Sequence, residues 1–295
     1  MKFPVVVIKG AGDLASGVAH RLFMAGFPVC MTELENPLAV RRLVSFAEAV
    51  HRGTMEIEGV RAFSAATLSE AKRILKERSC IPVLVDPRGV TAGKLKPRIV
   101  IDGRMAKTNL GTTIDEAQLV IGLGPGFAAG TDVDFVIETK RGHNLGKVIH
   151  EGEAQADDGI PEPILGHGEE RVLRAPCDGV LTSFADIGRK VRKGEEICAV
   201  DGRYISATIN GVLRGMLTSG SQVKKGMKLG DIDPRGEKSL CFTISDKARA
   251  IGGGVLEAIL IHLGRTRASF GVRRKSHTVE EEPDSNKLAS AGEER

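Results

Sequence analysis

The stretch "VVVIKGAGDLASG", residues 5–17, decides the fold of the first half of the chain. Its β-branched residues predict a buried strand, a G-x-G-x-x-A pattern follows, and a period of three to four residues then predicts a helix. Gly10 can make the tight turn, Gly12 lets the backbone approach a phosphate, and Ala15 permits close helix–strand packing. The free N–H groups that begin such a helix attract anions. The stretch therefore predicts a Rossmann-like unit that binds a nucleotide-like ligand, and the alternative is a fold whose glycines serve packing alone.

The pattern of this opening stretch continues through residues 1–150. Short apolar runs alternate with segments of helical period: the runs are residues 5–8, 27–33 and 82–86, and the helical segments are residues 13–25, 37–51 and 68–78. Strands that are apolar throughout and separated by helices are typical of a parallel sheet covered on both faces. We therefore expect residues 1–150 to form an open α/β domain that binds a nucleotide or cofactor, with a strand order that the sequence leaves open.

Composition and charge restrict the function classes. Hydrophobic residues make up 41% and charged residues 27%, as in ordinary globular proteins, but the chain has no Trp and one Tyr, which disfavours binding of nucleic acid by base stacking. The last twenty residues, 276–295, are acidic and poor in hydrophobic residues, so we expect a disordered tail. The remaining body is basic, which could serve an anionic small molecule or an acidic partner. The charge is too dispersed for a nucleic-acid partner.

The cysteine, histidine and hydropathy patterns indicate where in the cell the protein lies. The five cysteines are odd in number and never form C-x-x-C, and the histidines show no metal-ligand spacing, so we expect neither disulfides nor a metal site. No apolar run reaches the 18 or so residues of a membrane span, and the first residues lead into a strand instead of a signal peptide. We expect a cytoplasmic protein with no membrane partner. Cys30 could receive sulfur or selenium, although a cysteine beside apolar residues is typical of a core.

An internal repeat follows residues 151–171, a polar segment rich in Gly and Pro that predicts a linker. The copies "DGVLTSFADIGRKVRKGEEICAVD" (178–201) and "NGVLRGMLTSGSQVKKGMKLGDID" (210–233) align without a gap. Each copy places short apolar strands between glycine turns, and two copies can cover each other's hydrophobic face. Residues 172–240 therefore predict a separate, pseudo-twofold β module.

The first copy resembles the signature of biotinyl/lipoyl-type domains in "APCDGVLTSFADIGRKVRKGEEI" (175–197). Carrier domains of that family present a modifiable Lys on the hairpin between the two halves. Here the hairpin reads "AVDGRYISA" (199–207) and contains no Lys, so we expect no biotin or lipoate and a structural or interaction role.

The segment "SDKARAIGGGVLEAILIHLGRTR" (245–267) predicts an amphipathic C-terminal helix over residues 245–268, with Ser245 and Asp246 at its cap and a possible break at the three glycines 252–254. The expected fold class is thus α/β, with a Rossmann-like open parallel sheet, a small all-β barrel-sandwich (lipoyl-like) domain and a C-terminal helix.

A second candidate site lies in "GLGPGFAAGTDVDFVIETKRGHNLG", residues 122–146. Gly124 and Gly126 belong to a Gly-Pro-Gly loop after an apolar strand, at the sheet edge where open α/β sheets bind ligands. Arg141 suits bidentate binding of an anion, and His143 could move a proton near neutral pH. With Glu138 these two are the candidate catalytic residues. The alternative is a charged turn that only connects two strands.

Other residues complete the candidate cofactor site. Glu33 ends the second apolar strand, where a dinucleotide fold holds an acidic residue for a ribose hydroxyl, and Lys107 follows another strand and could face an anion. Asp13 is unfavourable beside a pyrophosphate because the Asp13 carboxylate would repel this anion. The candidate cofactor-binding residues are Gly10, Gly12, Asp13, Ala15, Ser16, Gly17, Glu33, Lys107, Gly124, Gly126, Arg141 and His143.

Several stretches together resemble the YqeB-type accessory family of selenium-dependent molybdenum hydroxylase systems: "IKGAGDLASG", "ELENPLAVRR", the glycine-rich 122–146 segment, "ERVLRAP", and "LGDIDPRG" with "TISDKARAIGGGVLEAIL". The N-terminal half is also similar to xanthine dehydrogenase maturation factors, which bind molybdenum cofactor and deliver it to the hydroxylase. The resemblance implies a maturation role, with molybdopterin or its cytidine dinucleotide form as ligand. The implied partner is the molybdenum hydroxylase apo-enzyme or a sulfur- or selenium-delivery enzyme. The resemblance transfers no catalytic residue.

Two other functions stay open from the sequence. One is an NAD(P)-dependent oxidoreductase with Glu33 on the ribose. The other is a non-enzymatic scaffold, in which the β module and the C-terminal helix dock the maturation partners. Whether the chain turns over a substrate is undecided, and it could form a homo-oligomer.

Overall fold

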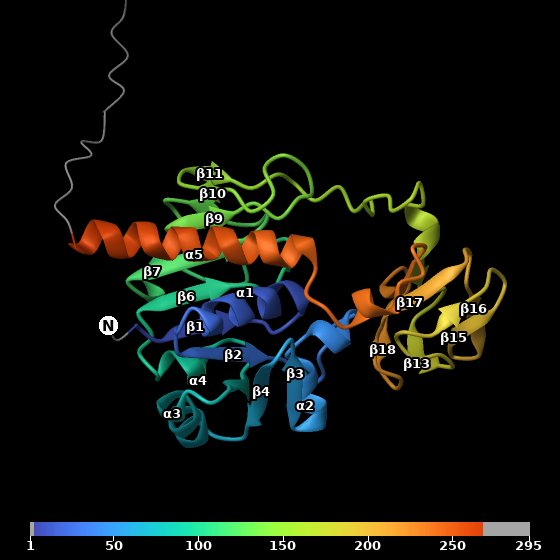
Figure 1. Ribbon diagram of the computed structural model, residues 1–295, viewed down its shortest axis with the longest axis horizontal. Helices are drawn as coiled ribbons and strands as arrows, with labels where there is room; N and C mark the ends of the chain where they lie inside the picture. Colours follow the sequence, from blue (N-terminus) through green and yellow to red (C-terminus); the bar gives the residue numbers. More distant parts are fainter. Residues whose placement is uncertain (1–2, 268–295) are drawn as a thin grey trace, which may run out of the picture.

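The computed structural model describes residues 3–267 and places them in a larger α/β domain and a smaller β module that lie next to each other (Figure 1). The C-terminal helix returns from the β module to the α/β domain, so residues 3–154 and residues 244–267 build one domain together. The predicted acidic tail, residues 276–295, lies outside the described residues.

A nine-stranded mixed sheet forms the centre of the α/β domain. In sheet order its strands are β10 (Val148–Ile149), β9 (Phe135–Ile137), β7 (Leu119–Leu123), β6 (Ile99–Asp102), β1 (Val6–Lys9), β2 (Val29–Glu33), β5 (Ile81–Val85), β4 (Val60–Ala65) and β3 (Thr54–Ile57). The seven strands from β9 to β4 are parallel, whereas β10 and β3 run antiparallel to their neighbours.

The expected parallel sheet forms the centre of this domain, but both of its edge strands are antiparallel, which the sequence did not predict. At one edge the missed element is the β3–β4 hairpin. Its two-residue turn, Glu58 and Gly59, has φ values of 45° and 79°, the left-handed pair that suits the twist of a hairpin. The Glu-Gly pair is not one of the usual turn signals, so the hairpin was not expected from the sequence.

Helices cover both faces of the sheet, as the alternation of buried side chains along β1 requires. Val6 and Ile8 face α1 (Asp13–Met24) and α5 (Asp246–Arg267), while Val7 faces α3 (Leu68–Glu77) and α4 (Val90–Gly93). The helix predicted over residues 37–51 is wrong in its first half. Only the one-turn η1 (Arg42–Val44) and α2 (Glu48–Arg52) form there, because residues 40–42 bond to the β module instead.

The helix α5 is continuous through its three glycines, so the break expected at residues 252–254 does not occur. The glycines allow close packing. A Cβ on Gly254 would overlap the carbonyl of Gly146, and one on Gly252 would lie 3.2 Å from the carbonyl oxygen of Gly17. Gly17 in turn faces Ala248, which brings α1 and α5 into direct backbone contact over the sheet.

The β module consists of two four-stranded antiparallel sheets around one core. The first sheet contains β12 (Val172–Arg174), β19 (Lys228–Asp233), β17 (Gly211–Met216) and β14 (Lys190–Val191), and the second contains β16 (Arg203–Ser206), β15 (Glu196–Val200), β13 (Gly179–Ser183) and β18 (Gln222–Val223). The predicted lipoyl-like barrel is therefore wrong, because hydrogen bonding divides the strands into two separate sheets. The repeat copies exchange strands: β14 of the first copy pairs with β17, and β18 of the second pairs with β13.

A short junction holds the two parts of the molecule together. The amide of Met216 in β17 donates to the carbonyl of Val40 at 2.8 Å, and a guanidinium N–H of Arg42 donates back to the carbonyl of Met216. Gly215 lies directly against Val40, where a larger residue would not fit. Leu43 packs on the core of the β module. Residues 40–43 therefore serve as a wedge from the α/β domain into the module.

Candidate functional site

The centre of the sheet contains a topological switch point. The chain leaves β1 toward β2 on one side, and later places β6 on the other side of β1. The loops after β1 and β6 meet here, since the amide of Gly103 donates to the carbonyl of Lys9 at 2.9 Å. A Cβ on Gly10 would lie 3.1 Å from the backbone of Arg104, so the close approach requires glycine. Open α/β sheets bind ligands in the crevice at such a point.

A cavity of about 470 Å³ opens at this point, and we call it the switch-point cavity. Gly12 is the N-cap of α1 and makes no side-chain cap, so the first N–H groups of the helix have no intrahelical acceptor. No atom lies within 4 Å of the place where a Cβ of Gly12 would be. The helix start therefore presents free donors and a positive dipole end to the cavity.

Glu33 lies at the end of β2, as predicted, and lines the switch-point cavity. Its carboxylate accepts from the amides of Ala11 and Leu34, both at 2.8 Å. It thus fixes the glycine loop, and its remaining lone pairs can still accept from a ligand. Asp13 also lines the cavity, and its charge lies 3.6 Å from a guanidinium nitrogen of Arg41, which offsets the repulsion expected for an anion.

Two residues predicted for cofactor binding instead stabilise the loop and helix. The hydroxyl of Ser16 donates to the carbonyl of Ala11 and accepts from the amide of Phe46. Gly17 packs against Ala248 of α5. Ala15 lines the switch-point cavity and also lies close behind Gly103, which is the packing role expected for a small residue.

A buried polar network supports the floor of the switch-point cavity. Arg104 lines the cavity, and its backbone amide and two guanidinium nitrogens all donate to the carboxylate of Asp102. The hydroxyl of Thr112 donates to the same carboxylate at 2.7 Å. Burial raises the pKa of Asp102, but these hydrogen bonds outweigh it and hold the pKa below its usual value. Lys9 pairs with Glu116 beside them. The network fixes the loop after β6 in one conformation.

A second cavity of about 610 Å³ adjoins the first, and we call it the interdomain cavity because both parts of the chain line it. The residues that line both cavities are Asp13, Leu14, Arg41, Met105 and Lys228. The two cavities therefore form one continuous cleft. The segment predicted as a linker contributes one wall of it, from Gln155 to Pro163.

Only some of the residues predicted in the 122–146 segment line a cavity. Arg141 lines the interdomain cavity and pairs with both carboxylate oxygens of Asp246, at 2.7 Å each. Lys107, predicted separately, lines the same cavity and pairs with Asp157. Pro125, between the two predicted glycines, lines it too. These residues are brought together with the Gly12 loop in one cleft.

The other residues predicted in the segment, Gly124, Gly126, Glu138 and His143, do not line either cavity. Gly124 and Gly126 have φ values of 75° and 104° and lie against Thr139 and Thr108, so they serve a tight turn. His143 is exposed away from the cleft. Glu138 is 2% exposed, and its two oxygens accept from the amides of Lys140 and Gln155. The prediction of His143 and Glu138 as catalytic residues is therefore not supported by their positions.

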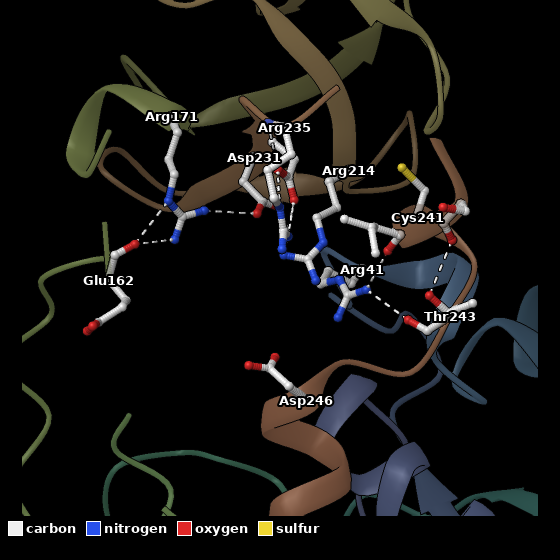
Figure 2. A network of polar contacts seen from close by, with 12 residues as sticks. Arg41, Glu162, Arg171, Arg214, Asp231, Arg235, Cys241, Thr243 and Asp246 are labelled. Atoms are coloured by element: carbon white, nitrogen blue, oxygen red, sulfur yellow. Dashed lines mark hydrogen bonds and ion pairs between the residues drawn. The ribbon is translucent and has the colours of Figure 1, made fainter. Parts of the chain in front are cut away.

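Sequence reasoning missed the basic residues that come from the β module and from the ends of the α/β domain. Arg41, Arg171 and Arg214 converge with Asp231 and Asp246 around the interdomain cavity (Figure 2). Arg41 is more than 100 residues away from the others in the chain, and each of these residues lies in a local pattern that is typical of an ordinary charged surface. Only the contact between the two parts of the chain could reveal them.

Within residues 3–267, no group of three or more His, Cys, Asp or Glu side chains is placed to hold a metal ion. No helix in this described part of the chain is long and apolar enough to cross a membrane.

Comparison with known proteins gives one close relative. No family model matches the chain. The "Uncharacterized protein YqeB" of Escherichia coli (strain K12) is 51% identical over 262 residues, which cover 88% of this chain and 48% of the relative. The chain therefore spans about half the length of the curated relative that it matches.

Solved structures resemble the chain only distantly. The product-bound ectoine utilization protein EutE (DoeB) from Ruegeria pomeroyi is 12% identical, with 78% of this chain and 85% of that chain covered and a TM-score of 0.24. An aspartoacylase family protein from Mesorhizobium loti gives the same identity and coverages with a TM-score of 0.27. At these scores the likeness carries no conclusion on fold or activity.

Proposed function

We propose that this protein is an accessory protein that binds a phosphorylated pterin or nucleotide-type cofactor and assists the maturation of a selenium-dependent molybdenum hydroxylase. Molybdopterin and its cytidine dinucleotide form are the cofactors we favour. The observation that carries the proposal is the uncapped start of α1 at Gly12, which opens into a cavity at the switch point of the sheet. The maturation role rests on the sequence resemblance to the accessory family.

The phosphate of such a cofactor fits the start of α1. Free N–H groups and the positive end of the helix dipole bind phosphate, and Gly12 leaves room for it because nothing occupies the place of its Cβ. Arg104 and Arg41 line the same cavity and add positive charge. Asp13 opposes the binding, but it already faces Arg41.

The ring of the cofactor fits the apolar side of the switch-point cavity. Leu14, Leu38, Met105 and Leu110 line it. Ligand pockets of this kind combine apolar walls with a few fixed polar groups, and here the polar groups are Glu33 and Arg104. A flat pterin or cytosine ring can contact the apolar walls while its edge reaches the Glu33 carboxylate.

Titration of purified protein with molybdopterin, its cytidine dinucleotide and CTP, followed by thermal shift and calorimetry, tests the proposal. A Gly12→Ala variant should fold normally, because the φ of −64° at this position suits alanine and no atom obstructs the methyl group. Its methyl group would occupy the phosphate position, so we expect binding weaker by about tenfold or more.

Gly93→Ala is the matched control, since it adds the same methyl group at an exposed helix position with free space around it. Stabilisation of the wild type by none of these cofactors would contradict the proposal. Equal affinity of the two alanine variants would place the ligand elsewhere. A further assay adds the loaded protein to apo-hydroxylase, whose activity should rise with the wild type and less with Gly12→Ala.

An NAD(P)-dependent oxidoreductase is the second candidate, and the position of Glu33 at the end of β2 favours it. The same titrations with NAD(H) and NADP(H) separate the two functions. Binding of a nicotinamide cofactor tighter than that of any pterin cofactor would support the oxidoreductase. The scaffold alternative instead expects capture of the hydroxylase by the protein with no cofactor bound.

A further inference from the structure

More basic than acidic side chains line the interdomain cavity, and the proposed cofactor ring does not need this cavity. Nine basic side chains line it and only four acidic ones, Asp13, Asp157, Asp158 and Glu162. The basic side chains come from both parts of the molecule, for example Lys247 at the start of α5 and Arg214 in β17. An anion in this cavity would contact both the α/β domain and the β module.

Two arginines in its wall are buried beside each other. The side chains of Arg41 and Arg214 are 10% and 11% exposed, and the Nε–H group of each is buried without any hydrogen-bond acceptor. Burial lowers the pKa of Arg214, and the neighbouring charge of Arg41 lowers it further. Figure 2 shows their guanidinium groups side by side. Buried donors without partners are rare and call for a ligand or ion.

The carboxylates around these arginines are already engaged with other residues. Asp233 binds Arg235 through two guanidinium contacts of 2.6 and 2.9 Å and lies 3.5 Å from Arg214. Asp231 pairs with Arg171 through one oxygen, while its other oxygen has no hydrogen bond. Arg41 donates to the carbonyls of Leu240 and Thr243, but the carboxylate nearest to it in an ion pair, that of Asp13, lies 3.6 Å away. The protein thus compensates the two buried charges incompletely.

A third cation, Lys247, lines the same cavity. Lys247, in the first turn of α5, is largely buried, and this burial lowers the pKa of its amine. No ion pair of 4 Å or less joins Lys247 to a described carboxylate. All three cations thus line the space that an anion in this cavity would occupy.

We infer that the interdomain cavity binds a diphosphate group, or a similar oxyanion with several charges, between the β module and the α/β domain. Arginine guanidinium groups bind such oxyanions through pairs of parallel N–H donors. The diphosphate can be free inorganic pyrophosphate or part of a nucleotide whose ring occupies the adjoining switch-point cavity. In either case the bound anion links the two parts of the molecule.

Pyrophosphate is the suitable probe, because it has no ring and therefore tests this cavity independently of the proposed cofactor. Calorimetric titration of the full chain with pyrophosphate should show binding that weakens at high salt. Titration with CDP and ADP separates the two sources: tighter binding of a nucleoside diphosphate than of pyrophosphate indicates that a nucleotide supplies the diphosphate.

Two variants remove one charge from each side of the cavity. In Arg214→Gln, Asp233 keeps both contacts with Arg235, so the fold should persist. Lys247→Gln removes the positive charge that α5 contributes to the cavity. Each should weaken pyrophosphate binding by about tenfold or more, since each removes a charge-assisted contact. Without pyrophosphate, Arg214→Gln should melt no lower than the wild type, because the repulsion from Arg41 is gone.

Arg203→Gln, in the exposed strand β16, is the control and should bind as the wild type does. Three results would overturn the inference: no binding of pyrophosphate to the wild type, equal binding by Arg214→Gln and Arg203→Gln, or loss of binding in Gly12→Ala alone. The last result would assign the anion to the start of α1. It would leave the proposed cofactor site intact and remove the interdomain one.

Discussion

Cys30 lies in the middle of β2 with none of its side chain exposed, packed against residues of α3 and α4. Burial raises the pKa of its thiol to about 12, and the nearby charge of Asp86 adds to the effect. A thiol in this state is neither ionised nor accessible. The structure therefore places Cys30 in the core and argues against the sulfur- or selenium-accepting role considered from the sequence.

Alkylation of the native protein tests this difference between cysteines. At pH 8 a thiol with a pKa near 12 is ionised in roughly one molecule in ten thousand. Iodoacetamide should therefore label the partly exposed Cys80 and Cys177 and leave Cys30 unlabelled, as read by peptide mass spectrometry. All five cysteines should react in guanidinium. Labelling of native Cys30 as fast as that of Cys80 would contradict its core role.

Single residues of the cleft could be predicted only where a local pattern marks them. Gly10, Gly12 and Glu33 belong to one strand–turn–helix–strand unit, and the structure places all three at the switch-point cavity. Arg41 and Arg214 meet across the contact between two parts of the chain, which no local pattern encodes. The charges of "ETKRGHN" drew attention to His143, although neighbours in an extended segment need not face one side.

Among the elements, α5 shows how three glycines can stabilise a helix contact instead of breaking the helix. Glycine in a helix normally costs about 1 kcal/mol relative to alanine. At Gly254 the absence of a side chain permits contact with the backbone of Gly146, while Gly264 of the same helix has free space around it. The two positions therefore predict opposite effects of the same substitution.

Gly254→Ala should destabilise the protein by about 1–3 kcal/mol, because its methyl group would push against the carbonyl of Gly146. Gly264→Ala should instead be neutral or stabilise by up to about 1 kcal/mol. The free energy of unfolding in urea, followed by circular dichroism, gives both values. A stabilising Gly254→Ala would show that α5 does not pack as closely as described.

Where the local sequence pattern was clear, the type of element, strand or helix, was predicted correctly. The strands at 5–8 and 82–86, the helix at 68–78 and the C-terminal helix each lie within about two residues of β1, β5, α3 and α5. The helix predicted over residues 37–51 is wrong in its first half because Val40 and Leu43 pack on the β module, whereas Phe46, Ala47 and Ala49 pack in the core of the α/β domain. Sequence periodicity cannot tell which neighbour an apolar residue will meet.

At the scale of the whole molecule, the wedge of residues 40–43 joins the two parts. Leu43 packs on the core of the β module although it belongs to the α/β domain. Burial of a leucine contributes about 1.5–3 kcal/mol, so a charge at this position should separate the two parts. In addition, the hydrogen bonds of Met216 with Val40 and Arg42 fix the orientation of the cleft walls.

Leu43→Glu should uncouple the α/β domain from the β module, so that scanning calorimetry resolves two melting transitions where the wild type shows one. Leu260→Glu introduces the same charge on the exposed side of α5 and should leave a single transition. Pyrophosphate should bind less tightly to Leu43→Glu, since the cavity walls come from both parts. One transition in both variants would mean that the other junction contacts suffice.

The return of α5 to the first domain has a consequence for biosynthesis. A ribosome makes residues 3–154 before the β module, and the β module before the helix whose Ile251, Val255 and Ile259 cover one face of the large sheet. The β module can therefore close while the earlier domain still exposes an apolar face. The nascent α/β domain remains open to misassociation until α5 emerges.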